Sequence, residues 1–268
     1  MKQPIITLSS DFGIQSQGIG NMEGVIAQIA PNTRVIHLMH GIPNFDIRTA
    51  ARTMEVVNFM PVGFHVCIVD PGVGTKRRAI IIQVERGDYL IGPDNGVLIS
   101  AVNILGGAKK IVEITNPKYM IKPVSPIFHG RHIFAPAAAY LSNGVPIEEF
   151  GPRLEFDQLV SAPYSEATIK DDIINSEVIN INKFGSLNLN ILHSTWDKLN
   201  LSSHQIVQVT FKGKTISLPF VETFGAVEEG KPVILKDDYG RVEIAINLGD
   251  FAKKYNIRVG DFFVIKKL

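Results

Sequence analysis

Three polar segments in the first half of the chain carry side chains that could do acid–base and electrostatic chemistry. Asp70 begins an Asp-Pro-Gly-Val-Gly-Thr run, Arg77 follows that run, and His129 lies in a Phe-His-Gly-Arg run. Arginine keeps its positive charge at physiological pH and histidine exchanges protons near neutrality, so this set could stabilise an anion and accept a proton. The alternative is that Asp70 caps a turn, Arg77 is solvated and His129 begins a helix.

The elements around these segments predict where the side chains meet. Strand-like apolar runs cover residues 5–8, 35–38, 64–69, 79–84 and 88–91, and helical spacing covers residues 19–29, 47–57, 95–105 and 133–141. Strands that alternate with helices favour an α/β domain with a mostly parallel sheet flanked by helices. Ligands bind beyond the carboxyl ends of the strands in such sheets, and the polar segments that begin at Ser9, Asp70 and Gly92 lie there.

The pattern changes after about residue 155, where short β-like segments are separated by Gly, Asn, Asp and Lys clusters. This spacing predicts a smaller antiparallel β-sandwich or barrel. We expect a domain boundary between residues 155 and 172, with an N-terminal α/β domain over 1–160 and a C-terminal β domain over 172–268. The expected strands are Val178–Ile181, Gln205–Phe211, Thr215–Leu218, Pro232–Leu235, Val242–Ile246 and Phe262–Ile265.

The composition limits which kinds of partner the protein can have and in which cellular compartment it is expected. The 268 residues include 27 Lys+Arg and 26 Asp+Glu, a formal net charge of +1, without a charged tail, which argues against a nucleic-acid partner. There is no apolar run near the ~20 residues of a membrane span and no leader-like N-terminus, so we expect no membrane partner. The one cysteine, Cys67, lies in an apolar run and can form no disulfide within the chain. We therefore expect a cytoplasmic protein.

Three familiar motifs fail on physical grounds. The glycine-rich run 18–24 does not directly follow a strand, as a dinucleotide loop must, and the run 72–76 lacks the glycine–lysine spacing of a phosphate loop. His129 and His132 have the spacing of metal ligands on a helix but no accompanying Cys, Asp or Glu cluster. We expect no cofactor and no metal.

Taken together, the polar segments resemble the S-adenosylmethionine (SAM) hydroxide adenosyltransferase family, which is related to SAM-dependent fluorinases and chlorinases. The resemblance spans nearly the whole chain, and its most specific blocks are Asp-Pro-Gly-Val-Gly-Thr and Phe-His-Gly-Arg. It implies an N-terminal α/β catalytic domain, a C-terminal β domain that completes the nucleoside site, and a homotrimer with each site between neighbouring subunits. The other segments that carry it are 10–13, 40–43, 45–46, 93–96, 184–185 and 242–245.

The resemblance implies that SAM is split by water into adenosine and L-methionine, with Asp70, Arg77 and His129 catalytic and Asp11 on the ribose. The sulfonium of SAM is already a good leaving group, so the reaction lacks only a competent nucleophile. Arg77 can stabilise hydroxide character on a bound water, Asp70 can orient it, and His129 can accept a proton. Whether His129 takes the proton or the set acts on a pre-formed hydroxide stays open. SAM is the substrate, and no cofactor is implied.

The halogenating relatives are disfavoured by two positions. They carry a tyrosine where this chain has Asp70, and a tyrosine–serine pair where it has His129 and Gly130. The residues that contact the halide are therefore missing, and the water-activating residues are present.

The chain departs from the family pattern in the pocket around this set, at Ser16, Gly18, Asn182, Ser186, Leu189 and the pair Asp237–Asp238. The substrate-binding residues that we expect are Asp11, Phe184, Ser186, Asp238 and Glu243. Asp238 and Glu243 are alternatively surface residues of a strand. The altered pocket leaves two other functions open, a non-catalytic adenosine- or SAM-binding protein and a hydrolase of a different adenosyl sulfonium or thioether.

Overall fold

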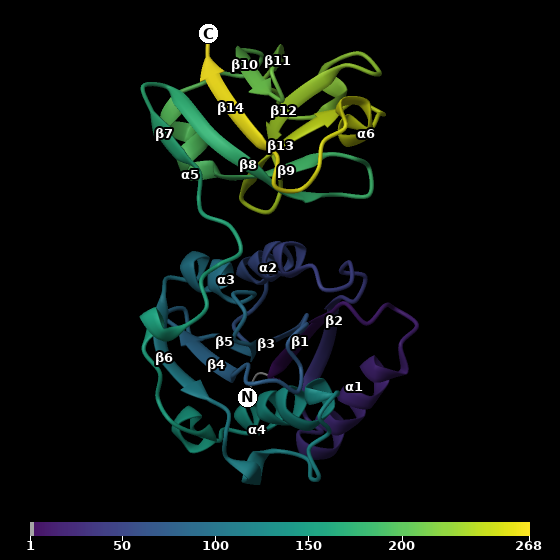
Figure 1. Cartoon of the computed structure of the whole chain (residues 1–268), viewed down its shortest axis with the longest axis vertical. Helices are drawn as coiled ribbons and strands as arrows, with labels where there is room; N and C mark the ends of the chain where they lie inside the picture. The colour runs from purple at the N-terminus through teal and green to yellow at the C-terminus, as the bar shows by residue number, and fades with distance from the viewer. Residues whose placement is uncertain (1–2) are drawn as a thin grey trace. The chain divides into compact units, whose positions relative to one another are not determined.

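The computed structural model describes residues 3–268, which form two compact units (Figure 1). The first unit ends at Pro163 and the second begins at Tyr164. Each unit has its own sheet and its own apolar core.

The first unit is built on a six-stranded sheet with strand order β2-β1-β3-β5-β4-β6. The strands β2, β1, β3 and β5 are mutually parallel, and β4 is antiparallel to both of its neighbours. This confirms the mostly parallel sheet, and the expected strands near 79–84 and 88–91 pair with each other as β4 and β5. The sequence analysis did not identify β6. The bounds are β1 (Ile5–Ser10), β2 (Arg34–Met39), β3 (Phe64–Ile68), β4 (Ala79–Val84), β5 (Tyr89–Pro93) and β6 (Ala108–Glu113).

Helices cover both faces of this sheet. Buried side chains of α1 (Gln17–Ile29) and α4 (Ala135–Ser142) pack with Ile6, Leu8 and Ile68 in one core cluster. The buried side chains of α2 (Ile47–Glu55) and α3 (Ile99–Ile104) pack with Cys67 and Ile80 in a second core cluster. Successive side chains along each strand therefore point alternately into one core cluster and the other. Figure 1 shows α2 and α3 on one side of the strands and α1 and α4 on the other.

Two expected helices differ at their starts. The helix expected from Asn95 begins at Ile99, because Gly96 has a positive φ of 91° and Asn95 Oδ1 accepts from the Val97 amide in a turn. The helix expected from residue 133 is preceded by a π-helical turn, Gly130–Phe134, which begins directly after His129. Asp46 is a good helix-capping residue by type and caps α2, since its carboxylate accepts from the Thr49 amide at 2.9 Å.

The second unit is an antiparallel, nearly closed barrel-like sheet with order β11-β10-β14-β8-β9-β13-β12, and β7 pairs with β8. A bridge between Phe220 and Ile234 joins the two ends of this order. Its core contains Trp196, Phe211, Phe251 and Phe263. The expected antiparallel domain is confirmed, and the analysis missed β7 and β9. The bounds are β7 (Thr168–Lys170), β8 (Ile173–Ile181), β9 (Leu187–Leu192), β10 (Ile206–Phe211), β11 (Lys214–Pro219), β12 (Pro232–Lys236), β13 (Arg241–Ile246), β14 (Phe262–Lys267), α5 (His193–Trp196) and α6 (Phe251–Tyr255).

Short 3₁₀ turns complete both units, at Val56–Phe59, Pro117–Tyr119, Ile147–Phe150, Phe156–Gln158, Asp197–Leu199 and Phe224–Ala226. Within residues 3–268, the helices are all too short or too polar to cross a membrane.

Candidate functional site

Asp70, Arg77 and His129 meet at one end of the first unit's sheet. Asp70 follows β3, Arg77 lies just before β4, and His129 directly precedes the π-helical turn. Arg77 Nε donates to Asp70 Oδ1 at 3.0 Å, and Arg77 Nη2 donates both to the other Asp70 oxygen and to His129 Nδ1, the latter at 3.0 Å. The fork of the guanidinium thus joins a carboxylate and an imidazole that are 59 residues apart, from position 70 to position 129.

This cluster is shielded from solvent. The side chains of Arg77 and Asp70 are 7% and 5% exposed, and the guanidinium carbon lies 5.4 Å from the centroid of the Phe134 ring. Within the described part of the chain, Arg77 Nη1 is buried and has no hydrogen-bond acceptor, so the protein leaves its two N–H groups unsatisfied. Burial, together with the Arg77 charge, lowers the pKa of His129 below its usual range.

The geometry also assigns the tautomer of His129. Because an arginine N–H can only donate, the Nδ1 atom that faces Arg77 must carry a lone pair. The neutral imidazole therefore carries its hydrogen on Nε2. His129 accordingly offers a hydrogen-bond donor, and its one basic nitrogen is occupied by the guanidinium.

A cavity of about 360 Å³ adjoins the cluster. Asp70 and His129 lie in its wall, and Arg77 contacts both of them. Asp11, at the end of β1, lies in the same wall and accepts from the Phe45 amide at 2.9 Å. The remaining lining residues are Phe12, Asn44, Phe45, Ile68, Val73, Ile127, Phe128 and Gly130. The sequence analysis had singled out neither Asn44 nor the aromatic wall, although Phe45 and Phe128 stand in motifs that it used.

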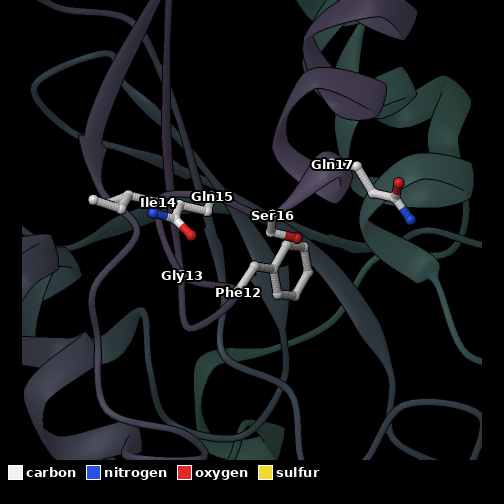
Figure 2. A pocket seen from close by; sticks show the side chains of 6 residues that line it. All are labelled: Phe12, Gly13, Ile14, Gln15, Ser16 and Gln17. Atoms are coloured by element: carbon white, nitrogen blue, oxygen red, sulfur yellow. The ribbon is translucent and has the colours of Figure 1, made fainter.

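A more open hollow of about 660 Å³ adjoins the loop 12–17, and Phe12 lines both hollows. Figure 2 shows the Phe12 ring beside Ser16, with Gln17 set apart from them. Ser16 caps α1 by accepting from the Gly18 amide at 3.2 Å. A Cβ atom at Gly18 would lie 3.3 Å from the Phe128 ring and 3.4 Å from the Phe12 ring, which pack edge to face at 5.8 Å. Gly18 therefore leaves room for this aromatic wall.

The other four expected substrate-binding residues, Phe184, Ser186, Asp238 and Glu243, belong to the second unit. Phe184 and Asp238 are exposed, and Ser186 and Glu243 are buried. Their binding roles stay predictions. Within this unit, Asn188 Nδ2 donates to Glu243 Oε2 at 3.3 Å and to Asp237 Oδ2 at 3.1 Å.

Asp237 and Asn188 are polar residues of this unit that the sequence analysis did not select. Asp237 is buried and accepts from the amides of Tyr239 and Arg241, which shapes the turn between β12 and β13. The alternation Leu-Asn-Leu-Asn-Ile-Leu over β9 was the signal for Asn188, since it marks a strand with an asparagine face.

Across residues 3–268, no group of three or more His, Cys, Asp and Glu side chains is arranged to hold a metal. His132 instead contacts the Phe128 carbonyl at 3.0 Å and the Arg131 guanidinium at 3.3 Å. Its role is therefore to hold the π-helical turn.

Comparison with known proteins agrees with this architecture. A family model described as the SAM hydroxide adenosyltransferase N-terminal domain matches residues 6–151, and the model of the C-terminal domain matches residues 176–264. The (R)-S-adenosyl-L-methionine hydrolase of Salinispora tropica is 36% identical, over 96% of this chain and 96% of that protein. A similar hydrolase of Thermus thermophilus is 32% identical, over 96% and 97% of the two chains.

More distant relatives include a fluorinase of Actinoplanes sp., 26% identical over 96% of this chain and 95% of that protein. The crystal structure of an uncharacterized conserved protein from Thermotoga maritima superposes with a TM-score of 0.91 at 31% identity, over 98% of this chain and 100% of that chain. The two family models and the full-length hydrolase relatives lead to one conclusion. The chain belongs to the SAM hydroxide adenosyltransferase family.

Proposed function

We propose that this protein hydrolyses SAM to adenosine and L-methionine. The observation that carries the proposal is the Asp70–Arg77–His129 cluster beside the first unit's cavity. The relatives named (R)-SAM hydrolase, at 32% to 36% identity over nearly the full chain, support the same reaction.

The reaction is an in-line displacement at C5′ of the adenosyl group. The oxygen of a water or hydroxide forms a bond to C5′ while the C5′–S bond breaks, and the electron pair of that bond goes to the sulfonium. The sulfur leaves as the neutral thioether of methionine, and attack by water releases one proton. Since the leaving group needs no acid, the enzyme has to supply only position and a stabilised nucleophile.

The tautomer of His129 favours one of the two proton-transfer schemes. With Nδ1 occupied by Arg77, His129 donates from Nε2 to the attacking oxygen and does not act as the proton acceptor. Asp70 can accept a hydrogen from the same water, and the Arg77 charge offsets the charge of this carboxylate. The arrangement suits an oxygen with hydroxide character, held between a donor and an acceptor.

The proposal includes three points that are implied by the family. The enzyme uses no cofactor, because the positively charged sulfur of the substrate is already a good leaving group. It is a homotrimer in which a neighbouring subunit contributes to each site, which light scattering of the purified protein tests by its mass. It acts in the cytoplasm, which fractionation of the native host tests.

A second candidate substrate, another adenosyl sulfonium, is favoured by one observation. Asp237 and Glu243 are buried carboxylates joined through Asn188, where the family pattern has an asparagine at the first position. An acid in place of the family's asparagine changes the polar groups of this unit, which is the reason to vary the departing chain of the substrate. A panel of adenosyl sulfoniums and thioethers that vary only in the departing chain separates this candidate from SAM.

The decisive experiment is turnover of SAM in heavy-oxygen water. The expected result is one labelled oxygen in the 5′-hydroxyl of adenosine and none in methionine. Adenosine without label would overturn attack at C5′. Tight binding of adenosine or SAM by calorimetry with no product would identify a binding protein on the same fold.

A further inference from the structure

Four polar side chains form a continuous hydrogen-bonded row in the first unit. Glu23 lies on α1, His37 on β2, His40 directly after β2, and Ser10 at the end of β1. His37 Nε2 lies 3.2 Å from Glu23 Oε2, and His37 Nδ1 lies 2.9 Å from His40 Nε2. The row ends where His40 Nδ1 meets Ser10 Oγ at 2.7 Å. It leads from an exposed glutamate to a serine that is fully buried.

The buried end of this row holds both ends of the loop that carries Asp11. The His40 side chain contacts Ser10, and the His40 carbonyl accepts from the Gly13 amide at 2.8 Å. Asp11 and Phe12, the two residues between these contacts, both line the cavity. One residue outside the cavity lining therefore fixes a segment of its wall at both ends.

The atoms allow one consistent direction of donation when both imidazoles are neutral. Ser10 Oγ accepts from the Phe12 amide at 3.4 Å and can give its hydrogen to His40 Nδ1. His40 Nε2–H then donates to His37 Nδ1, and His37 Nε2–H donates to the Glu23 carboxylate. Burial, with the neighbouring His37, lowers the pKa of His40 to about 4, so His40 is neutral near pH 7.

At position 40, a ring with two nitrogens on opposite sides joins Ser10 to His37. A side chain with one polar end can satisfy Ser10 or His37 but cannot join them. Loss of the His40 ring removes one of the two hydrogen-bond partners of the buried Ser10 hydroxyl, so the loop that this hydroxyl anchors is held less firmly.

We propose that His40 is a positioning residue for substrate binding, which acts through Ser10 to hold Asp11 toward the cavity. This inference rests on the proposed function, because the substrate whose binding it supports is SAM. It predicts that breaking the row raises KM and leaves kcat nearly unchanged, since none of the hydrogen bonds given above joins the row to the Asp70–Arg77–His129 cluster.

The test is a double-variant cycle on the full-length protein with SAM as substrate. His40→Ala and Ser10→Ala should each raise KM about tenfold and change kcat less than about twofold. The double variant should match the larger single effect, because both substitutions break one connection. His40→Asn, which keeps a polar atom near the position of Nδ1, should recover most of the loss in KM. The control is His204→Asn, an exposed histidine of the second unit beside Ser203, which should leave KM and kcat unchanged.

Three outcomes would overturn the inference: an unchanged KM in both single variants, a fall in kcat at constant KM, or single effects that multiply in the double variant. If His40→Ala does not fold, the cycle is run with His40→Phe in its place, and the same outcomes decide. If the wild type does not hydrolyse SAM, the proposed function fails, and the cycle is read from calorimetric binding of adenosine instead. Equal adenosine affinity across the variants then overturns the inference separately.

Discussion

The two units treat buried carboxylates in opposite ways. In the first unit, both oxygens of Asp70 are held by the Arg77 guanidinium, which also holds His129. In the second unit, Asp237 and Glu243 share the amide of Asn188. A guanidinium that donates to a carboxylate and an imidazole fixes both groups relative to one another, whereas the amide of Asn188 holds two carboxylates near each other in the second unit. We therefore predict that the first unit's cluster carries the chemistry and that the polar residues of the second unit affect substrate selectivity.

The largest effect is expected from removing the fork. Arg77→Ala leaves a buried carboxylate without its charge partner and frees His129 to change tautomer, so kcat should fall by about 10³-fold or more. Arg77→Lys keeps the charge but cannot bridge the two partners, and should recover little of the loss. Adenosine release measured by chromatography checks both variants.

The control for the fork is Arg153→Lys. Arg153 pairs with Glu155 at the surface, where both side chains are mostly exposed, so this variant should keep wild-type rates. If Arg77→Ala keeps the wild-type kcat, the first unit's cluster does not carry the reaction. Thermal unfolding of each variant shows whether the fold is intact.

The next effect concerns the donor role of His129. His129→Ala should lower kcat by about 10²-fold. His129→Gln, which can still donate an N–H toward the attacking oxygen, should retain more activity than His129→Glu, which cannot donate when ionised. Equal losses in Gln and Glu would argue against the assigned tautomer.

The pH dependence tests the same contact. Because the pKa of His129 is lowered, the ring stays neutral to a pH below the usual value of about 6.5, so activity should persist through that value and fall only as the pH drops through the lowered pKa. Protonation places a hydrogen on Nδ1, which faces Arg77, and the contact is lost. Initial rates between pH 4 and pH 8 at saturating SAM should show one acidic limb, and that limb should be absent in His129→Gln.

The lowered pKa of His40 makes the stability of the protein fall at low pH as well. Its pKa of about 4 in the folded protein lies below the usual value of about 6.5, so the unfolded chain binds the extra proton first. The free energy of unfolding should fall as the pH drops from about 6.5 to about 4. Urea unfolding at several pH values should show a shallower fall in His40→Asn, and an unchanged slope would contradict this account.

A smaller effect separates the two adjacent acids of the second unit. Asp237→Asn removes a buried carboxylate next to Asn188 and should change KM for SAM by about threefold to tenfold, with kcat little changed. Asp238→Asn is the matched control, because Asp238 is exposed on the same turn. If Asp238→Asn has the larger effect on KM, the residue expected from the sequence is the substrate ligand and the buried neighbour is structural.

The smallest effect is expected at Gly18. A Cβ atom there would lie between 3.2 and 3.4 Å from the flexible side chains of Ser16, Phe128 and Phe12. Gly18→Ala should therefore shift the aromatic wall slightly and change KM no more than about twofold. A change in kcat beyond that range would show that the wall also positions the reacting groups.

Much of this molecule could be read from local signals. The Asp46 cap, the sheet strands near Ile5 and Phe64, and the antiparallel segments after residue 172 follow from propensity, periodicity and capping, which act over a few residues. The missed strand β9 carried a readable alternation of leucine and asparagine. The π-helical turn after His129 carried no such local signal. At its first residue, a Cβ atom at Gly130 would lie 2.9 Å from Met22 Sδ and 3.1 Å from Ile68, a close approach that only the tertiary structure shows.

What the sequence alone determined is the residue types, their order, and the strand ends that carry them. It placed Asp70 and Arg77 in the loop after a strand and His129 just before a helix, since loop position follows from the alternation of strands and helices. Only the tertiary structure decided that one guanidinium joins the other two side chains, which nitrogen of His129 is basic, and that His40 holds both ends of the Asp11 loop. Those are matters of a few ångströms and of hydrogen-bond direction between distant segments, and only the packed sheet brings these atoms within reach of one another.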